Sequence, residues 1–480
     1  MDGTLVKSDT LVDSVLVLAR HRPLSLFRIP GWILRGKAAF KAQVSSEVTL
    51  DPVYLPYNRV LLQFLEQQHA TGRKIYLATA ADSSLAERVA AYLGLFDGVL
   101  ASDGSTNLAG KHKLAAFRDR FTAGYCYIGN AMPDRTLLAG SSGAMVANPH
   151  AGLLRALKQD KTTITREFID RKPYARTFFK EIRVHQWAKN GLIFLPLLLA
   201  HDRRLTSIYA AVLAFLSFSL AASATYIIND LVDIESDRRH SSKNRRPFAA
   251  GDLSPFTGIG IIVVFFAAAI LIALSLPKQT LPLVGNIVLP APQGFLFWLL
   301  MYVVVTLSYS FKLKRMMIVD VIVLSMLYTL RMAAGAAATA NQISPWLAAF
   351  GLFFFLSLAM IKRFSELEDL RTRGEISASG RGYHVQDLEQ LRSFGTASAY
   401  ASVVVFTLYI SSAEVSQYYP HASRLWLLAP LLILWLSRMW LLASRGELHE
   451  DPVVYAITNR SSLFLGILVV LVVVLASLSR

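Results

Sequence analysis

Three aspartates follow a long apolar run near the middle of the chain, at the spacing of a metal site. The segment begins at Thr225 and reads TYIINDLVDIESDRRHSSKNRRPFAAG. If the apolar helix continues through it, Asp230, Asp233 and Asp237 lie at i, i+3 and i+7 on one face. Carboxylates crowded on one face repel one another unless cations neutralise them, and Mg²⁺ accepts carboxylate oxygens while leaving positions open for phosphates. We therefore expect these aspartates to bind Mg²⁺ or a diphosphate, with Asn229 in support; the alternative is a solvated helix end whose acids pair with the basic residues that follow.

The composition of the chain places much of it in a membrane. Of its 480 residues 54% are hydrophobic and only 17% are charged, which is too apolar for a soluble globular protein. Long apolar runs recur from about Gly191 onward, whereas residues 1–185 mix charged and apolar residues as a soluble domain does. We expect an α/β domain over 1–165, a linker with an amphipathic segment over 166–185 and an all-α membrane bundle over 186–480.

A single cysteine, Cys126, excludes an intrachain disulfide framework and a thiolate metal site, and it fits a reducing compartment. A cleavable signal peptide is not expected, because charges at Arg20 and Arg22 interrupt the first apolar stretch. The N-terminal domain is therefore expected in the cytoplasm.

Nine apolar runs approach the roughly 20 residues that cross a bilayer. They lie at about 189–202, 206–228, 255–276, 293–311, 316–339, 345–362, 396–413, 423–444 and 461–479. With a cytoplasmic N-terminus, the loops that return to the cytoplasm hold sixteen basic residues and the alternate loops hold four. This bias follows the positive-inside rule and accounts for much of the net charge of +16, so we do not expect nucleic-acid binding. The sequence predicts a multi-pass protein of the cell membrane with the aspartate-rich segment on the cytoplasmic side.

The aspartates also carry a resemblance to a known family. The pattern NDxxDxxxDR from Asn229 to Arg238, followed by Lys243 and RPxAxG from Arg246, resembles the first aspartate-rich motif of the UbiA superfamily of intramembrane prenyltransferases. The likeness covers roughly 180–480 and includes RxxQWxKN from Arg183. It implies a bundle of nine helices around a lipid-accessible cavity, with Mg²⁺ held against a diphosphate by the aspartates.

The second acidic motif departs from the common pattern of aromatic prenyltransferases. Where many members have DxxxD, this chain reads KRFSELED from Lys362, and LSYSFKLKR and YTLRMAAG precede it. These segments are similar to the branch that transfers phosphoribose from phosphoribosyl diphosphate to a polyprenyl phosphate in cell-wall biosynthesis. The resemblance implies that activity, with a prenyltransferase acting on an aromatic acceptor as the alternative.

Both reactions need positive charge around a departing pyrophosphate. The expected phosphate-binding side chains are Lys189, Lys243, Arg246, Lys312 and Lys362, and Glu366 is expected to bind metal or sugar hydroxyls. Some of these basic residues could instead serve only the positive-inside bias.

Two ionisable residues lie deeper in the membrane part. Asp320 and Arg331 are eleven positions apart in one run, so they share a helix face with about 16 Å between them. Intramembrane charges usually face a cavity, although Arg331 could instead extend towards the far surface.

A lipid-carrier transporter is a different class of function that the apolar runs would permit. Transporters place polar sites near the midplane of the membrane and show repeated halves. Here the polar motifs gather at one end and no repeat is visible, which favours an enzyme.

The N-terminal domain alternates strand-like and helical stretches. KIYLATAADSS at 74–84 and AGYCYIGNAMPD at 123–134 read as strands that end in polar loops, AERVAAYLGLF as a helix, and 11–70 as a helical cap. Such alternation predicts a parallel sheet whose site lies beyond the carboxyl ends of the strands.

Polar residues at these strand ends resemble, in order, the four motifs of haloacid dehalogenase-like (HAD) phosphatases. They are Asp2, Thr79, Lys113 and Asp134, to which the resemblance gives the roles of acid/base, two phosphate ligands and a Mg²⁺ ligand. Asn130 stands where an acid is frequent, and the place of the nucleophilic Asp precedes Met1. We expect a phosphatase-like domain that, as written, cannot turn over by the usual covalent route, with an Asp encoded before Met1 if the true start lies upstream.

Overall fold

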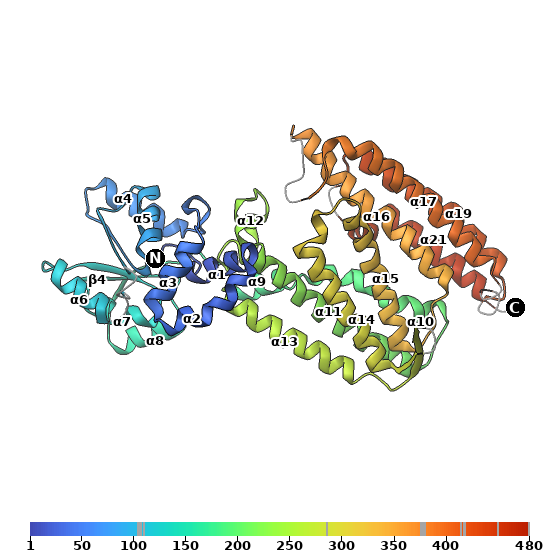
Figure 1. The fold of residues 1–480 in the computed structure, drawn as a ribbon, viewed down its shortest axis with the longest axis horizontal. Coiled ribbons are helices and arrows are strands. Elements are labelled where there is room, and N and C mark those ends of the chain that lie inside the picture. Colours follow the sequence, from blue (N-terminus) through green and yellow to red (C-terminus); the bar gives the residue numbers. More distant parts are fainter. Residues whose placement is uncertain are drawn as a thin grey trace. The chain divides into compact units, whose positions relative to one another are not determined.

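The computed structural model describes residues 1–102, 108, 111–284, 287–374, 381–412, 415, 419–448 and 451–478. The chain divides into two compact units (Figure 1). The first unit joins Met1–Ile182 to Tyr226–Ile262, and the second joins Arg183–Thr225 to Val263–Arg480. The aspartate-rich segment therefore packs with the N-terminal residues, although 43 membrane-associated positions separate the two pieces in sequence.

The first 70 residues of the first unit are mainly helical, as the sequence predicted. They form α1 (Thr10–His21), η1 (Pro23–Arg28), α2 (Ile29–Leu34), α3 (Lys37–Glu47), η2 (Pro52–Tyr54) and α4 (Arg59–Ala70). Asp9 caps α1 and Asn58 caps α4, in each case by accepting hydrogen bonds from backbone N–H groups of the first turn.

Parallel strands alternate with helices in the remainder of this unit, which confirms the predicted α/β class. Strand β1 (Tyr76–Asp82) pairs with β2 (Gly98–Ser102), and β3 (Cys126–Gly129), β4 (Gly143–Ala147) and β5 (Ile164–Phe168) pair in that order. The helices between them are α5 (Ser83–Leu93), α6 (Lys111–Arg120), η3 (Met132–Asp134), α7 (Arg135–Ala139) and α8 (Ala151–Gln159). The described strands thus make two parallel sheets, of two and three strands, where the sequence suggested one.

The first unit is completed by α9 (Tyr174–Glu181) and by the aspartate-rich segment with α12 (Ile234–Arg239) and η5 (Lys243–Arg245). Two long helices, α11 (Leu205–Val232) and α13 (Pro255–Leu274), lead into and out of this segment.

The second unit is a helical bundle, to which α11 and α13 contribute their apolar parts. It begins with η4 (Val184–Phe194) and α10 (Leu195–Leu199), and a hairpin of β6 (Thr280–Val284) and β7 (Ile287–Pro290) follows α13. The other elements are α14 (Ala291–Phe311), η6 (Leu313–Arg315), α15 (Val319–Thr339), α16 (Pro345–Thr372), η7 (Val385–Asp387), α17 (Leu388–Ile410), η8 (Ala422–Leu427), α19 (Leu428–Ser444), α20 (Pro452–Thr458) and α21 (Arg460–Ser477).

Eight helices in the described part of the chain are long and apolar enough to cross a membrane, by length and composition. They match the second to ninth predicted spans. The first predicted span, 189–202, falls on η4 and α10, where a 3₁₀ segment replaces most of the expected α-helix.

Helix α15 lies at the centre of the bundle, because 72% of its spanning window is buried, compared with 11% for α21. One close approach depends on glycine: a Cβ at Gly335 would lie 2.1 Å from the carbonyl oxygen of Ile193 in η4. Two turns earlier in α15, Tyr328 stacks on Phe355 of α16 with ring centroids 4.7 Å apart. This packing fixes the helices that carry the buried polar groups of the bundle.

Candidate functional site

The aspartate-rich segment begins inside α11 and continues across a one-residue break. Asp230 lies in the last turn of α11, Asp233 follows the helix, and Asp237 lies in α12. The Asp233 N–H donates to the Asn229 carbonyl and the Asp237 N–H donates to the Asp233 carbonyl, both at 2.8 Å. Helical hydrogen bonding therefore continues across the break and keeps all three aspartates in consecutive turns.

Two of the three carboxylates converge on one arginine. Nη1 of Arg246 donates to Oδ1 of Asp230 at 2.9 Å and to Oδ2 of Asp237 at 2.7 Å. Both carboxylates are buried, with 4% of each side chain exposed, whereas 30% of the Arg246 side chain is exposed. Burial raises the pKa of the Asp237 carboxyl and Asp230 adds to this rise, although Arg246 opposes it. The cluster therefore favours a cation between the two carboxylates.

The third carboxylate has a different partner. Asp233 forms an ion pair with Arg20 of α1, whose Nη1 also donates to the carbonyl of Val232 at 3.3 Å. Within the described residues, no group of three or more histidine, cysteine, aspartate or glutamate side chains is gathered for a metal ion. The structure thus brings Asp230 and Asp237 together and holds Asp233 on the N-terminal helix.

This donor set fits Mg²⁺ with two protein ligands. Mg²⁺ is commonly held by one or two carboxylates, with phosphate oxygens and waters in its other positions. The oxygens of Asp230 and Asp237 that meet on a single nitrogen of Arg246 are of the type that such an ion accepts. Asn229 supplies a backbone carbonyl to the turn, and exposed Lys243 adds a positive charge that lowers the pKa of Asp237.

A second charged contact ties the same segment to α1. Arg238 of α12 lies 2.8 Å from Asp13 of α1, and only 5% and 0% of the two side chains are exposed. Arg238 also donates to Ser8 at 3.2 Å and to the carbonyl of Ala249 at 3.1 Å. Because Ser8 in turn donates to Asp13 at 2.6 Å, the four groups form a buried network.

A further buried carboxylate fixes the end of the segment. Asp252 is contacted by Lys7 at 3.4 Å and by Lys172 at 3.3 Å. Gly251 has a φ of +70°, and a Cβ there would lie 2.7 Å from the Lys7 side chain. The N-terminal residues therefore hold the aspartate-rich segment at both of its ends.

In the second unit, two of the predicted phosphate-binding lysines share one carboxylate. Lys189 and Lys362 lie 2.7 Å and 3.0 Å from Oδ2 of Asp451. Burial opposes ionisation of Asp451, but the two lysines outweigh it, so the pKa of its carboxyl lies below the usual range. This Lys189–Lys362–Asp451 cluster gathers two positive charges on one negative charge.

The predicted acid Glu366 is held by two arginines, Arg363 and Arg381. Arg363 is almost fully buried and lies 2.8 Å from Asp320 of α15. Tyr383 donates a hydrogen bond to the same carboxylate. The buried charge of Asp320 is therefore paired between helices, and Glu366 lies at the partly exposed end of this chain of charges. Lys312, after α14, is exposed.

Arg331 is buried inside the bundle, which excludes an extended path to the far surface. Its Nε donates to the side chain of Asn190 at 2.8 Å and its Nη2 to the Tyr302 hydroxyl at 3.3 Å. Its guanidinium also lies 5.6 Å from the Phe218 ring and 5.5 Å from the Tyr328 ring. The arginine is thus satisfied by polar and aromatic groups of its own helix and of neighbouring segments.

Three of the four HAD-like residues converge at the carboxyl end of β3. Lys113 donates to the Tyr127 hydroxyl at 2.7 Å, and this hydroxyl donates to Asp134 at 2.7 Å. Burial lowers the pKa of Lys113, and the charges of Asp134 and Asp2 oppose this change. Asn130 accepts a hydrogen bond from Thr4 at 3.2 Å, which brings the Met1–Thr4 turn to the same place.

The fourth residue, Thr79, lies in β1 and is buried. Its hydroxyl accepts a hydrogen bond from the N–H of Ala81 at 3.0 Å, which is a local capping contact. Asp2 accepts a hydrogen bond from the N–H of Thr10, the first residue of α1, at 3.2 Å.

Comparison with known proteins decides the family. Residues 192–468 match the UbiA prenyltransferase family. The chain belongs to this family. A relative named y4nM in Sinorhizobium fredii is 36% identical over 99% of the UbiA-family chain and 90% of its own length. Decaprenyl-phosphate phosphoribosyltransferase of Mycobacterium tuberculosis is 34% identical over 48% of the chain and 72% of its own length.

A solved structure of a UbiA homologue from Archaeoglobus fulgidus, bound to GPP and Mg²⁺, also matches. It is 17% identical to the UbiA-family chain, with a TM-score of 0.45, and the match covers 62% of this chain and 97% of that one.

Sequence analysis missed the two arginine contacts that hold the UbiA motif. Arg20 precedes Asp233 by 213 positions, and Asp13 precedes Arg238 by 225. The available signal was the polar face of the first amphipathic helix, where Asp13 and Arg20 are seven positions apart, two helical turns.

Proposed function

We propose that this UbiA-family chain transfers a phosphoribosyl group from phosphoribosyl diphosphate to a polyprenyl phosphate and releases pyrophosphate. The observation that carries the proposal is the convergence of buried Asp230 and Asp237 on one guanidinium nitrogen of Arg246. The choice of sugar over prenyl group is supported by the mycobacterial phosphoribosyltransferase that is 34% identical to this chain, and by the segment KRFSELED.

Each polar cluster has a distinct role in this proposal. Asp230 and Asp237 hold the diphosphate end of the donor, and Asp233 keeps the aspartate-rich segment in contact with α1. When the donor binds, the guanidinium of Arg246 contacts the phosphates instead of the two carboxylates. Mg²⁺, when bound, neutralises the charge that develops on the departing pyrophosphate. In the second unit, Lys189 and Lys362 bind phosphate oxygens and Asp451 keeps the two ammonium groups together.

Further residues complete the assignment. Lys243 and Lys312 are exposed cations that attract anionic substrates, and Glu366 contacts ribose hydroxyls from its position between two arginines. The N-terminal unit and the aspartate-rich segment lie on the cytoplasmic side, where a soluble phosphoribosyl donor is present.

The test is a transfer assay on the full chain in detergent. Labelled phosphoribosyl diphosphate, a polyprenyl phosphate and Mg²⁺ should give a labelled lipid, and Asp230→Ala and Asp237→Ala should each reduce the rate by at least a hundredfold. Glu235→Ala is the matched control, because Glu235 lies on α12 with Asp237 but pairs with Arg239 and His21 instead. Failure of the wild-type chain with phosphoribosyl diphosphate, combined with transfer from a prenyl diphosphate to an aromatic acceptor, would support the alternative prenyltransferase.

We also propose that the N-terminal unit contains a HAD-like phosphate-binding site. This proposal is supported by the convergence of Lys113, Asp134, Asp2 and Asn130. The chain starting at Met1 should release no phosphate from the phosphoribosyl lipid or from p-nitrophenyl phosphate. Turnover that is lost in Asp2→Asn would contradict the expectation that this domain lacks its nucleophile.

A further inference from the structure

Four large apolar side chains of the first unit are exposed on one short stretch of its helical region. The stretch consists of η1 and α2, which together cover 23–34 and follow α1. The exposed fractions are 78% for Leu24, 83% for Phe27, 55% for Ile33 and 88% for Leu34. Apolar groups gathered in this way usually mark a surface that another molecule covers. We call these four side chains, together with the exposed Arg22, Arg28 and Arg35, the η1–α2 surface.

The inner side of the same stretch is anchored in the core of the unit. Trp32 is buried and belongs to the same apolar core as Leu18 of α1 and Val44 of α3. Ser25 is also buried. The exposed apolar side chains therefore belong to a segment that is fixed on its inner side, and their exposure is not that of a loose chain end.

The stretch around this surface carries basic residues without acidic ones. No aspartate or glutamate lies between Asp13 and Glu47, whereas Arg22, Arg28 and Arg35 are all exposed. Exposed arginines among exposed apolar side chains are the combination that an anionic lipid surface attracts. The apolar groups enter the boundary of the acyl chains, and the cations pair with the headgroup phosphates.

The first unit reaches the membrane through two helices. It contains 226–232, the end of α11, and 255–262, the start of α13. Both helices are long and apolar enough to cross a membrane. Phe256, in the first turn of α13, is an exposed apolar side chain of the same unit. The bilayer surface therefore lies next to this unit, at the level where α11 and α13 leave the membrane.

Helix α1 runs along the aspartate-rich segment towards that surface. In the first turn of α1, Asp13 lies 2.8 Å from Arg238, and near its end Arg20 donates to the carbonyl of Val232 at 3.3 Å. Movement along α1 thus corresponds to a return from α12 to the last residue of α11. Because η1 starts at Pro23, it leaves α1 at the end that faces the membrane.

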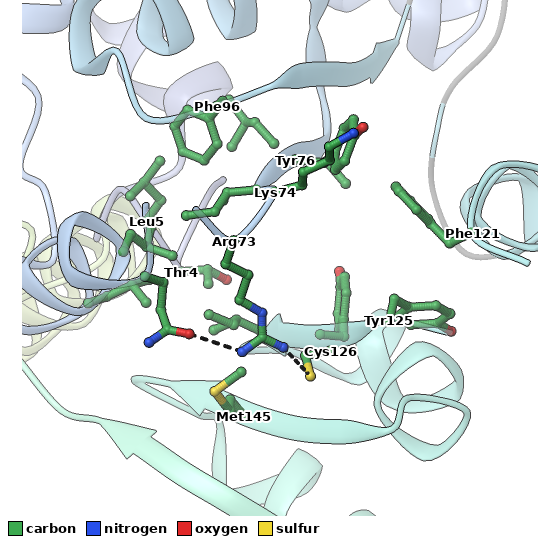
Figure 2. Close-up of a pocket in the computed structure, with 18 of the residues that line it drawn as sticks. Thr4, Leu5, Arg73, Lys74, Tyr76, Phe96, Phe121, Tyr125, Cys126 and Met145 are labelled. Atoms are coloured by element: carbon green, nitrogen blue, oxygen red, sulfur yellow. Dashed lines mark hydrogen bonds between the residues drawn. The ribbon is translucent and has the colours of Figure 1, made fainter. Parts of the chain in front are cut away.

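The η1–α2 surface is separate from the cavity of this unit. A cavity of about 440 Å³ is lined by residues of β1, β3, α4 and α6, and Figure 2 shows Tyr76, Phe121 and Cys126 around it. None of the four exposed apolar side chains belongs to the described lining of this cavity. Their exposure is therefore that of an outer surface and not that of an internal binding site.

We propose that the η1–α2 surface docks on the lipid bilayer, in the leaflet from which α11 and α13 emerge. The four apolar side chains enter the boundary of the acyl chains, and the three arginines contact the headgroups of anionic phospholipids. The contact anchors the end of α1, and α1 holds Asp233 and Arg238 of the aspartate-rich segment. Lipid docking thus supports the position of this segment, and it does not depend on which group the enzyme transfers.

Quenchers carried by lipids test the contact on the full chain. The chain is reconstituted in nanodiscs of phosphatidylcholine and phosphatidylglycerol, with Cys126→Ser as the background and one bimane label on Leu34→Cys or on Val60→Cys. Val60 is the matched control, because it is an exposed apolar residue of α4, which lies apart from α2 in Figure 1. Nitroxide groups on the acyl chains should quench the label on Leu34→Cys at least threefold more than the label on Val60→Cys.

Hydrogen exchange tests the chain without a label. Amides of 23–35 should exchange at least fivefold more slowly in nanodiscs that contain phosphatidylglycerol than in nanodiscs of phosphatidylcholine alone. Arg35→Gln should reduce this difference, whereas Arg118→Gln, which removes one exposed charge from α6, should leave it unchanged. Phe27→Ser combined with Leu34→Ser should abolish the protection, because the apolar groups that enter the bilayer are then lost.

Four outcomes would overturn the proposal. The first is equal quenching of the labels at the two positions. The second is protection of 23–35 that is the same in detergent and in nanodiscs, which would mean that the chain itself covers the surface. The third is protection that rises with the number of chains in each nanodisc, which would mean that a second copy covers it. The fourth is an equal effect of Arg35→Gln and Arg118→Gln, which would leave only an effect of net charge.

Discussion

The buried ion pair between Asp13 and Arg238 should determine the local stability of the aspartate-rich segment. With 0% and 5% of the two side chains exposed, replacing one partner leaves an uncompensated charge away from water. Loss of one member of a buried pair typically costs about 3–5 kcal/mol. Asp13→Asn keeps the shape of the carboxylate and removes its charge, so we expect a loss of about 3 kcal/mol in the local stability of α12.

Hydrogen exchange on the full chain in detergent measures this local stability directly. Because each 1.4 kcal/mol is about a tenfold change in an equilibrium constant, amides of 234–250 should exchange roughly a hundredfold faster in Asp13→Asn. Arg22→Ala is the matched control, since Arg22 ends the same helix and its pair with Glu47 is 63% exposed on the arginine side. An exposed pair contributes about 0–1 kcal/mol, so this control should change exchange by less than tenfold.

The double variant separates charge from packing. Asp13→Leu combined with Arg238→Met removes both charges and should regain much of the stability that Asp13→Asn loses. If Asp13→Asn and Arg22→Ala accelerate exchange equally, or if the double variant is less stable than Asp13→Asn, the reasoning from the buried pair is refuted.

Three further outcomes are expected. Gly335→Ala should lower the stability of the bundle by roughly 1–3 kcal/mol in detergent melting, because the added Cβ meets a backbone carbonyl. Gly351→Ala is the control and should have little effect, because a Cβ at Gly351 would lie 3.4 Å from its nearest neighbour, the sulfur of Met332. Burial and the neighbouring charge of Lys113 lower the pKa of the Met1 α-amino group to about 6, which means that the unfolded chain binds more protons between pH 6 and 8. The free energy of unfolding should therefore rise by roughly 3 kcal/mol over this interval, as measured by hydrogen exchange of the first unit. In sealed vesicles, the natural cysteine and a Lys243→Cys cysteine should be labelled from the same side, and an Arg203→Cys cysteine from the opposite side.

Local patterns made the elements predictable. The helical 11–70 region, the strands in KIYLATAADSS and AGYCYIGNAMPD, and eight of the nine predicted spans follow from short-range periodicity, and the structure confirms them. The division of the described parallel strands into two sheets was not visible in the sequence, because strand order depends on contacts between distant segments.

The candidate site was predictable in composition but not in pairing. The spacing of Asp230 and Asp237 correctly placed them together, and both readings of the cluster, a cation site and arginine pairing, meet in Arg246. Asp233 has the same spacing signal, yet Arg20 holds it apart from the other two through a contact that spans 213 positions. Periodicity indicates which side chains share one face of a helix, but it does not identify their partners on a distant helix.

The number of membrane crossings follows from these same contacts. The ion pairs of Asp13 with Arg238 and of Arg20 with Asp233 join residues before Ile182 to residues after α11, so both sets lie on one side of the membrane. If α11 crosses the membrane once between them, we expect a second crossing before α11 begins. Only η4 and α10 are available, and a 3₁₀ rise of about 2.0 Å per residue followed by an α-helical rise of about 1.5 Å gives them a length of about 30 Å, the thickness of the hydrocarbon core. Eight helices of the described part of the chain meet the length criterion of a span, so the ninth crossing, over the sixteen residues of η4 and α10, stays a prediction.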